Sequence, residues 1–246
     1  MEQTFKFPTE VVDLPSKGLL YPKDSPLASG TIEMKYMTAK EEDILTNQNY
    51  IQKGIVIDKL LKSLIVSKVN YDDILICDKN ALLIAARVLG YGAEYTFEYG
   101  GAQQTIDLSK LENKQVDMTP FESGKNEFAY TLPTTNTQIT FKLLTHADEI
   151  SINREIEGLK KINKDSSSEL STRLKYMITS VNGDSSTKTV REFIDNAFLA
   201  RDSRAFREYV RNFQPDVEMK FYPEDGPAGG VDIPIGVSFF WPDAGV

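Results

Sequence analysis

The stretch LICDKNALLIAARVLGYGAEYTF, from Leu75 to Phe97, indicates how the rest of the chain is organised. A second version begins 124 positions later, at Leu199, and the two copies align in one register as far as Phe221. Each copy has an aspartate that can cap a helix, then apolar residues at helical spacing, then a short strand. The aligned positions include Asp78 with Asp202, Leu82 with Phe206, Leu89 with Phe213 and Phe97 with Phe221. The stretch therefore predicts a helix and a strand in each half of the chain, with Gly90 or Pro215 stopping the helix.

The likeness between the halves extends upstream of this stretch. TIEMKYMTAKEE, from Thr31 to Glu42, aligns with QITFKLLTHADE, from Gln138 to Glu149, and each alternates as a strand does. In each segment the strand ends in a threonine, Thr38 or Thr145, and an acid, Glu41 or Asp148, follows three residues later. This is the capping-box pattern that starts a helix. We therefore predict an α+β fold that is mostly helical, with small antiparallel sheets. Its core is an internally duplicated unit of β-hairpin, helices and closing strand, in which the turn at 70–73 recurs at 189–192.

The duplication predicts four regions along the chain. Residues 1–95 form the first repeat with an N-terminal arm, and residues 126–222 form the second repeat. Residues 96–125 form an inserted hairpin and a linker, because YTFEYGGAQQTIDL alternates on both sides of Gly100-Gly101. Residues 223–246 form a C-terminal aromatic tail.

The composition predicts a soluble globular protein, since 41% of the 246 residues are hydrophobic and 26% are charged. A formal net charge of -8 argues against nucleic acid as a partner, because phosphate binding needs a basic face. No run approaches the roughly 20 apolar residues of a membrane span, and MEQTFKFPTE lacks the marks of a secretory signal. We therefore expect the chain to fold in a cytoplasm, with no membrane partner.

The residue pattern nominates no active site. The single histidine, His146, lies at the first turn of a predicted helix, so we expect a surface or capping role and not a general base. The single cysteine, Cys77, lies among apolar residues and is expected to be a buried thiol. The acid clusters at 41–43 and 72–73 lie at helix starts, where the helix dipole accounts for them. We expect no enzyme, metal, cofactor or small-molecule substrate; an unrecognised enzyme would need a pocket with several ionisable groups of perturbed protonation.

The first candidate for partner binding is a row of arginines on the last repeat helix, which we call the arginine stripe. Its members are Arg201, Arg204, Arg207 and Arg211. Their intervals of three and four place them on one helix face. A solvated face is one interpretation. The other is a docking stripe for an acidic surface of a neighbouring subunit, because apolar residues commit the opposite face to the core.

The second candidate is the aromatic triplet Phe239, Phe240 and Trp241 in the C-terminal tail. Left in water, the triplet would form an apolar patch of the kind that monomeric proteins avoid. Two interpretations stay open. The segment can fold back on the second repeat as an added strand, since apolar residues alternate from Ile233 to Val237. Alternatively, it docks on a partner as a rigid aromatic anchor beyond the flexible PEDGPAGG segment.

A set of four segments carries a family resemblance. They are DLPSKGLLYP at Asp13–Pro22, GTIEMKYMTAKEEDIL at Gly30–Leu45, CDKNALLIAARVLGYGAEY at Cys77–Tyr95 and FFWPD at Phe239–Asp243. The set resembles the T4-type bacteriophage baseplate protein family, whose best-known member is a baseplate hub subunit, over nearly the whole chain. Similar sequences carry paired, zinc-ribbon-like cysteines where this chain has FEYGG at 97–101, so no metal is expected there.

The resemblance implies a non-enzymatic structural or assembly protein of a contractile-tailed bacteriophage. Its partners would be other baseplate or tail subunits, and its location would be the virion after assembly in the host cytoplasm. The alternative is a transient tail or baseplate assembly chaperone that is absent from the mature virion. The sequence does not separate these two functions.

Overall fold

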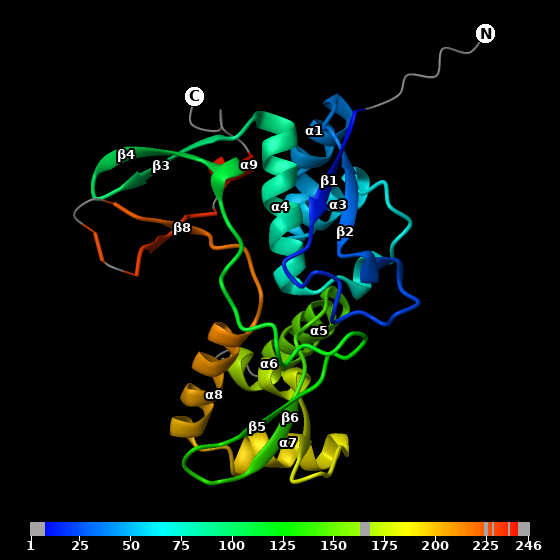
Figure 1. Cartoon of the computed structure of the whole chain (residues 1–246), viewed down its shortest axis with the longest axis vertical. Coiled ribbons are helices and arrows are strands. Elements are labelled where there is room, and N and C mark those ends of the chain that lie inside the picture. The colour runs from blue at the N-terminus through cyan, green and yellow to red at the C-terminus, as the bar shows by residue number, and fades with distance from the viewer. Residues whose placement is uncertain (1–7, 163–167, 224–225, 228, 236, 241–246) are drawn as a thin grey trace.

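Two strand-and-helix units, one for each predicted repeat, form the upper and lower parts of the molecule (Figure 1). The structure is a computed structural model that describes residues 8–162, 168–223, 226–227, 229–235 and 237–240. Residues 164–167 of the predicted loop at 164–168 lie outside the described residues, and so does Trp241.

The first unit is a two-stranded sheet followed by helices and a projecting hairpin. Its elements are β1 (Thr9–Asp13), η1 (Pro26–Ser29), β2 (Thr31–Lys35), α1 (Ala39–Leu45), α2 (Gln48–Gln52), α3 (Val56–Leu64), η2 (Tyr71–Asp73), α4 (Ile76–Tyr91), β3 (Glu94–Tyr99), β4 (Ala102–Asp107) and η3 (Leu108–Lys110). The predicted hairpin is confirmed as β3 and β4, which pair antiparallel from Glu94 with Asp107 to Tyr99 with Ala102. Gly100 and Gly101 make its two-residue turn with positive φ angles of 61° and 79°, a conformation that glycine adopts at little cost.

The second unit has a three-stranded sheet and longer helices. Its elements are β5 (Phe128–Thr131), β6 (Gln138–Phe141), α5 (His146–Ile162), α6 (Glu169–Met177), β7 (Ile178–Val181), α7 (Thr187–Asn196) and α8 (Ala200–Phe213). The chain then returns to the upper part of the molecule, where β8 (Lys220–Phe221), β9 (Val231–Asp232) and α9 (Val237–Phe240) follow, with β8 and α9 near β3 and β4 (Figure 1). All strand pairs in the named sheets are antiparallel. The predicted α+β class, with many helices and small antiparallel sheets, is confirmed.

An aspartate contact of the same kind is present in both units, as expected of a duplicated unit. Asp78, in the first turn of α4, accepts hydrogen bonds from the Ser16 backbone N–H at 2.9 Å and from the Ser16 hydroxyl at 2.6 Å. Asp202, in the first turn of α8, accepts from the Thr134 N–H at 2.7 Å and the Thr135 hydroxyl at 2.9 Å. Ser16 and Thr134 occupy matching places after Leu-Pro in the two halves. Each aspartate therefore fastens the first hairpin of its unit to the last helix.

The predicted capping boxes are present in both units, and each includes a lysine. In the first unit, Glu41 accepts from the Thr38 N–H at 3.0 Å, and the Lys35 ammonium lies 2.8 Å from the same carboxylate. The equivalent group in the second unit, 107 positions later, consists of Lys142, Thr145 and Asp148. A lysine at the end of a strand thus recurs with the cap, which supports one ancestral unit for both halves.

Three local predictions are wrong, for physical reasons. α4 continues through Gly90 to Tyr91 and stops at Gly92, whose φ is 83°; Gly90 instead leaves room for the Met37 side chain. Residues 189–192 lie inside α7, because that helix buries Val190 and Ile194 on one face and does not stop as a turn. Asp78 and Asp202 do not cap α4 and α8: the N-cap positions are Leu75 and Leu199, and each aspartate lies in the first turn and bonds to the first hairpin of its unit. β8 pairs with β9, so the closing strand of the second repeat forms a hairpin with the tail.

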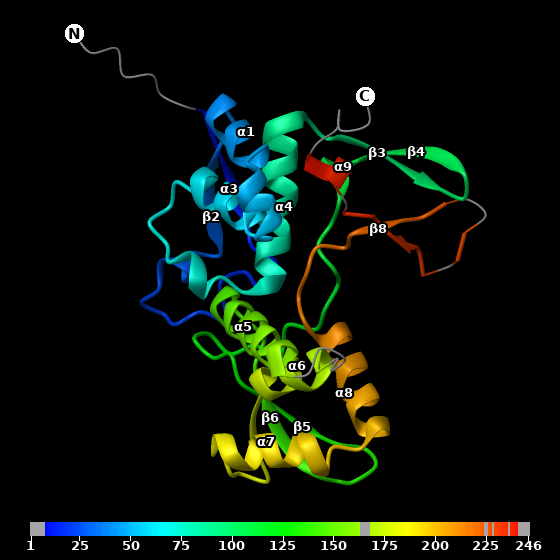
Figure 2. The same ribbon diagram turned by 180° about the vertical axis from the view of Figure 1, so that it is seen from behind.

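A continuous hydrophobic core joins the two units. The backbone also bridges them, since the Ile76 N–H donates to Leu144 at 2.9 Å and the His146 N–H donates to Ile74 at 2.8 Å. α5 therefore begins directly below the start of α4 (Figure 2). As its nearly continuous apolar sequence predicts, α4 is enclosed: each of its residues is buried or half-buried, and Leu82 has no exposed surface.

Candidate functional site

The arginine stripe lies on the outer face of α8. All four of its residues are exposed, while Phe206 and Val210 on the opposite face are buried, as the helical spacing predicts. Within the part of the chain that the structure describes, none of the four guanidinium groups forms an ion pair. The Arg207 Nε donates to the Ser203 carbonyl at 3.2 Å within the helix. The stripe is therefore a cationic surface without ion pairs among the described residues, on a chain of net charge -8.

An apolar hollow of about 250 Å³ borders the stripe between α6 and α8. Leu170, Leu174 and Met177 line one side, and Arg207 and Arg211 line the other. Leu170 is 47% exposed, so the hollow opens to solvent at an apolar side chain. The arrangement suits a ligand that presents acidic groups next to an apolar one, because the two chemistries lie side by side here.

The predicted aromatic docking surface in the tail is wrong for two of its three members. Phe239 and Phe240 are buried, with 0% and 1% of their surfaces exposed. The Phe239 ring packs edge-on against Tyr95 with 5.1 Å between centroids, and the Tyr95 hydroxyl donates to the Pro234 carbonyl at 2.6 Å. The tail therefore folds back in two ways: β9 pairs with β8 of the second repeat as an added strand, whereas the aromatic residues that follow pack on α4 and β3 of the first repeat. Its rings cover apolar surface within their own chain, which leaves them unavailable to a partner.

His146 is buried at the junction of the two units, which corrects the expected surface or capping role. Its ring lies edge-on to Tyr71 with 4.6 Å between centroids, and its Nε2 atom is 3.7 Å from the Asp58 carboxylate. Asp58 also accepts from the Tyr71 hydroxyl at 2.9 Å and from the Lys79 ammonium at 2.5 Å. The group joins residues of the first repeat to the start of α5, so the geometry gives it a role in holding the units together.

Protonation of His146 is expected to weaken the folded state. Burial lowers the pKa of His146 from its ordinary 6.5, and nearby Lys79 and Lys62 add to this, outweighing the attraction of Asp58 and Asp72. Since the unfolded chain then binds the proton more readily, stability is fully present above about pH 6.5 and falls as the pH drops toward the folded-state pKa. Urea unfolding at several pH values between 7 and 5 measures this slope.

The matched variant is His146→Gln, which removes the only imidazole and keeps a polar side chain. Buried Asp78 and half-buried Asp216, whose pKa values are raised by desolvation, remain in both proteins, so the difference between the two slopes isolates the histidine. A flatter slope in the variant supports the assignment. Equal slopes in the two proteins would show that protonation of His146 does not lower the stability of the folded protein.

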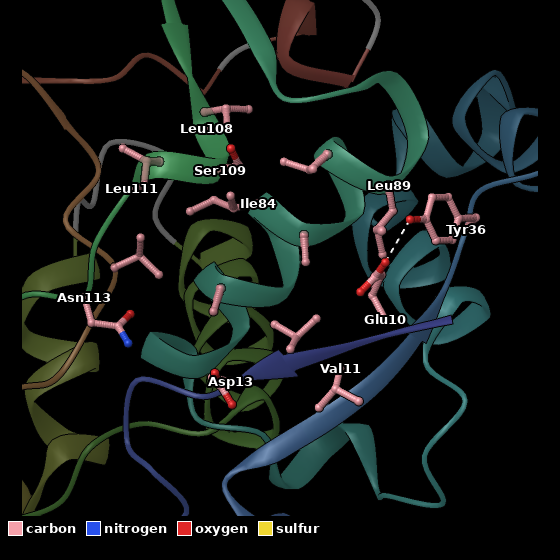
Figure 3. A pocket seen from close by; sticks show the side chains of 15 residues that line it. Glu10, Val11, Asp13, Tyr36, Ile84, Leu89, Leu108, Ser109, Leu111 and Asn113 are labelled. Atoms are coloured by element: carbon pink, nitrogen blue, oxygen red, sulfur yellow. Dashed lines mark hydrogen bonds between the residues drawn. The ribbon is translucent and has the colours of Figure 1, made fainter. Parts of the chain in front are cut away.

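A larger groove runs along α4, and sequence reasoning missed it. It has a volume of about 470 Å³; β1 forms one wall, and residues 108–113 form the other (Figure 3). Its floor is the face of α4 that carries Ala81, Ile84, Ala85 and Val88. We call this site the α4 groove. The sequence shows that this face of α4 is apolar and should be buried. Only the folded chain shows that part of the face stays open to solvent.

Cys77 is buried, as expected, and burial raises the pKa of its thiol well above the ordinary value. Among the described residues, no group of three or more His, Cys, Asp or Glu side chains is arranged to hold a metal ion. None of the described helices combines the length and apolar character required to cross a membrane. No family model, curated protein or solved structure matches the chain.

Proposed function

We propose that the chain is a structural component of a contractile-tailed bacteriophage baseplate, at or near its hub, and that it acts through protein–protein contacts. The baseplate setting rests on the resemblance of the four sequence segments. The mode of action rests on one observation, the exposed and unpaired arginine stripe beside an apolar hollow. In this proposal the stripe docks on an acidic surface of a neighbouring subunit in the virion.

Charge complementarity explains why such a surface favours binding over solvation. Arginine forms planar, bidentate contacts with carboxylates and is weakly hydrated, so it serves interfaces better than lysine does. Among the placed residues, no carboxylate forms an ion pair with the stripe, although Glu208 is exposed on the same helix. By contrast, Arg173 and Arg191, on neighbouring helices, are already held by Glu149 and Glu155 at 2.7 to 3.0 Å.

An acidic protein fits the surface better than nucleic acid does. The net charge of -8 repels a polyphosphate at long range, so four arginines would act against the field of the whole chain. The hollow beside the stripe is lined by Leu170, Leu174 and Met177, which suit apolar side chains and not phosphates. A neighbouring subunit with Asp or Glu around an apolar residue satisfies both features.

Charge reversal on the stripe tests the proposal. The double variant Arg204→Glu with Arg207→Glu is expected to weaken association with purified tail particles of the parent phage by at least about tenfold, because like charges then face each other. Its stability should change by less than about 0.5 kcal/mol per site, since both side chains are exposed. Co-sedimentation measures association, and thermal unfolding measures stability.

The matched control is Arg154→Glu, which reverses an exposed arginine on α5 away from the stripe. Equal association of the stripe variant and the control variant would contradict the docking role. Mass spectrometry of mature virions then separates the two possible functions: a permanent subunit is retained, while an assembly chaperone is found only in intermediates. If the wild-type chain bound duplex DNA and the stripe variant did not, the partner of the stripe would be nucleic acid and not a protein.

A further inference from the structure

The wall of the α4 groove includes an unpaired strand edge. The Tyr36 N–H donates to Pro8 at 3.2 Å and the Leu14 N–H donates to Gly30 at 2.8 Å, which sets the register of β1 on β2. In an antiparallel pair the bonding groups alternate, so the backbone groups of Thr9, Val11 and Asp13 point away from β2. Among the described residues, none of them makes a backbone bond on that side. β1 can therefore accept another strand.

The groove combines an apolar floor with acidic side chains. Glu10 and Asp13 both line it, and no Lys, Arg or His is found among its described lining residues. Neither carboxylate forms an ion pair with a placed residue; Glu10 accepts only from the Tyr36 hydroxyl, at 3.0 Å (Figure 3). Val11 beside them is 66% exposed. An occupant with apolar side chains and a neighbouring lysine or arginine would complement these groups.

The second repeat shows how such a place is filled. There the Phe121 ring, from the linker, packs on Phe128 at 5.4 Å and on Phe213 at 4.8 Å between centroids, and it is buried. In the alignment of the two repeats, Phe128 corresponds to Glu10 and Phe213 to Leu89. Both of those residues line the α4 groove (Figure 3). Among the described residues, the first repeat has no ring from a linker segment at the matching place, and Tyr36 is the aromatic residue that lines the groove there.

We propose that the α4 groove binds an extended segment of a partner protein, which adds as a strand to the free edge of β1. The segment places an aromatic side chain over α4 near Leu89, and its lysine or arginine pairs with Glu10 or Asp13. A second copy of the chain is a poor occupant, because pairing β1 with β1 would bring these carboxylates together. The groove is a surface separate from the arginine stripe, so it can be tested without any baseplate particle.

The probe is a labelled peptide, TVKFKVT, whose apolar residues alternate with lysines as a strand requires. Fluorescence anisotropy with the full chain is expected to show saturable binding. The peptide TVKAKVT, which lacks the aromatic anchor, should bind about tenfold more weakly or worse. The charge-reversed TVEFEVT should also bind more weakly, with a difference that shrinks as salt is added.

Two variants of the chain test the geometry. Val11→Pro removes the outward N–H of the edge strand, where proline is tolerated, and should weaken binding about five- to tenfold. Val11→Thr keeps that N–H and alters only the side chain, so the further loss of affinity in Val11→Pro relative to Val11→Thr measures the contribution of the N–H. Ala85→Phe fills the floor of the groove and should weaken binding without touching the edge. Thermal unfolding confirms that each variant is folded.

Several results would overturn the proposal. Absence of saturable binding at about millimolar peptide would do so. So would wild-type affinity in both Val11→Pro and Ala85→Phe. Residues 4–7 of the chain read TFKF, so much tighter binding to a chain that lacks residues 1–7 would identify the chain's own segment as the occupant. A dimer that the peptide dissociates would identify a second copy.

Discussion

Replacing Leu82 with alanine is expected to lower the free energy of unfolding by about 2–5 kcal/mol. Leu82 has no exposed surface and lies on α4, the helix that both the sheet of the first unit and the tail cover. The loss combines the transfer free energy of the removed methyl groups with the cavity left behind, because a close-packed core relaxes only in part. For a chain of this size, each kcal/mol lowers the melting temperature by about 2–4 °C. Thermal and urea unfolding both measure the effect.

The duplication supplies a matched comparison for this variant. Phe206 occupies the equivalent place on α8 and is also fully buried, so Phe206→Ala should cost about 3–5 kcal/mol. Leu199→Ala, at a leucine that is 47% exposed, should change stability by less than about 0.5 kcal/mol. If Leu82→Ala behaved like Leu199→Ala, the centre of the core would not lie at α4.

Replacing Phe239 with alanine is expected to cost about 3–5 kcal/mol, although the residue lies in what the sequence presents as a tail. Its ring is fully buried, and it contacts Tyr95 at 5.1 Å and Phe240 at 5.0 Å between centroids. Truncation removes both aromatic contacts and opens the surface of α4 beneath them. A fall in melting temperature that matches a core substitution is the expected result.

Ile235→Ala is the control for this second variant, because it lies in the same segment and is 42% exposed. Its effect should be small. The opposite result for Phe239→Ala, an unchanged melting temperature together with lost association with tail particles, would restore the docking interpretation of the tail. Tyr95→Phe gives an independent check, since it removes only the hydrogen bond to Pro234 and should cost about 0.5–1.5 kcal/mol.

The sequence predicted the repeated contacts well because they are local or follow a fixed register. The cap at Thr38 and Glu41 spans one helical turn, and the turn at Gly100 and Gly101 needs a glycine conformation that can be read residue by residue. The contacts of Asp78 and Asp202 span 62 to 68 positions and were not predicted: the alignment showed that the two aspartates are equivalent, but it indicated helix caps and not these distant partners. Duplication served as an internal comparison.

What the sequence did not reveal depends on which distant surfaces meet. The FFWPD segment reads as an exposed anchor because nothing near it in sequence covers it, while Tyr95 covers Phe239 from the other repeat. His146 reads as a surface cap until Tyr71 and Asp58 enclose it. The α4 groove is an opening between β1 and residues 108–113. Hydrophobic periodicity could not predict it, because periodicity shows which helix face is apolar but not whether that face is covered. The arginine stripe, in contrast, was predictable because helical spacing alone places it outside.

The packing of Phe239 on Tyr95 also sets the order in which a newly made chain can finish folding. The two residues are 144 positions apart, and ribosomes add about 5–20 residues each second, so Tyr95 emerges about 7–29 s before its partner is made. The hydrogen bond between Thr134 and Asp202 in the second repeat does not wait for the tail, since both residues are synthesised before it. The half that is translated first is therefore completed last, and its α4 surface stays uncovered on the nascent chain until residues 237–240 arrive.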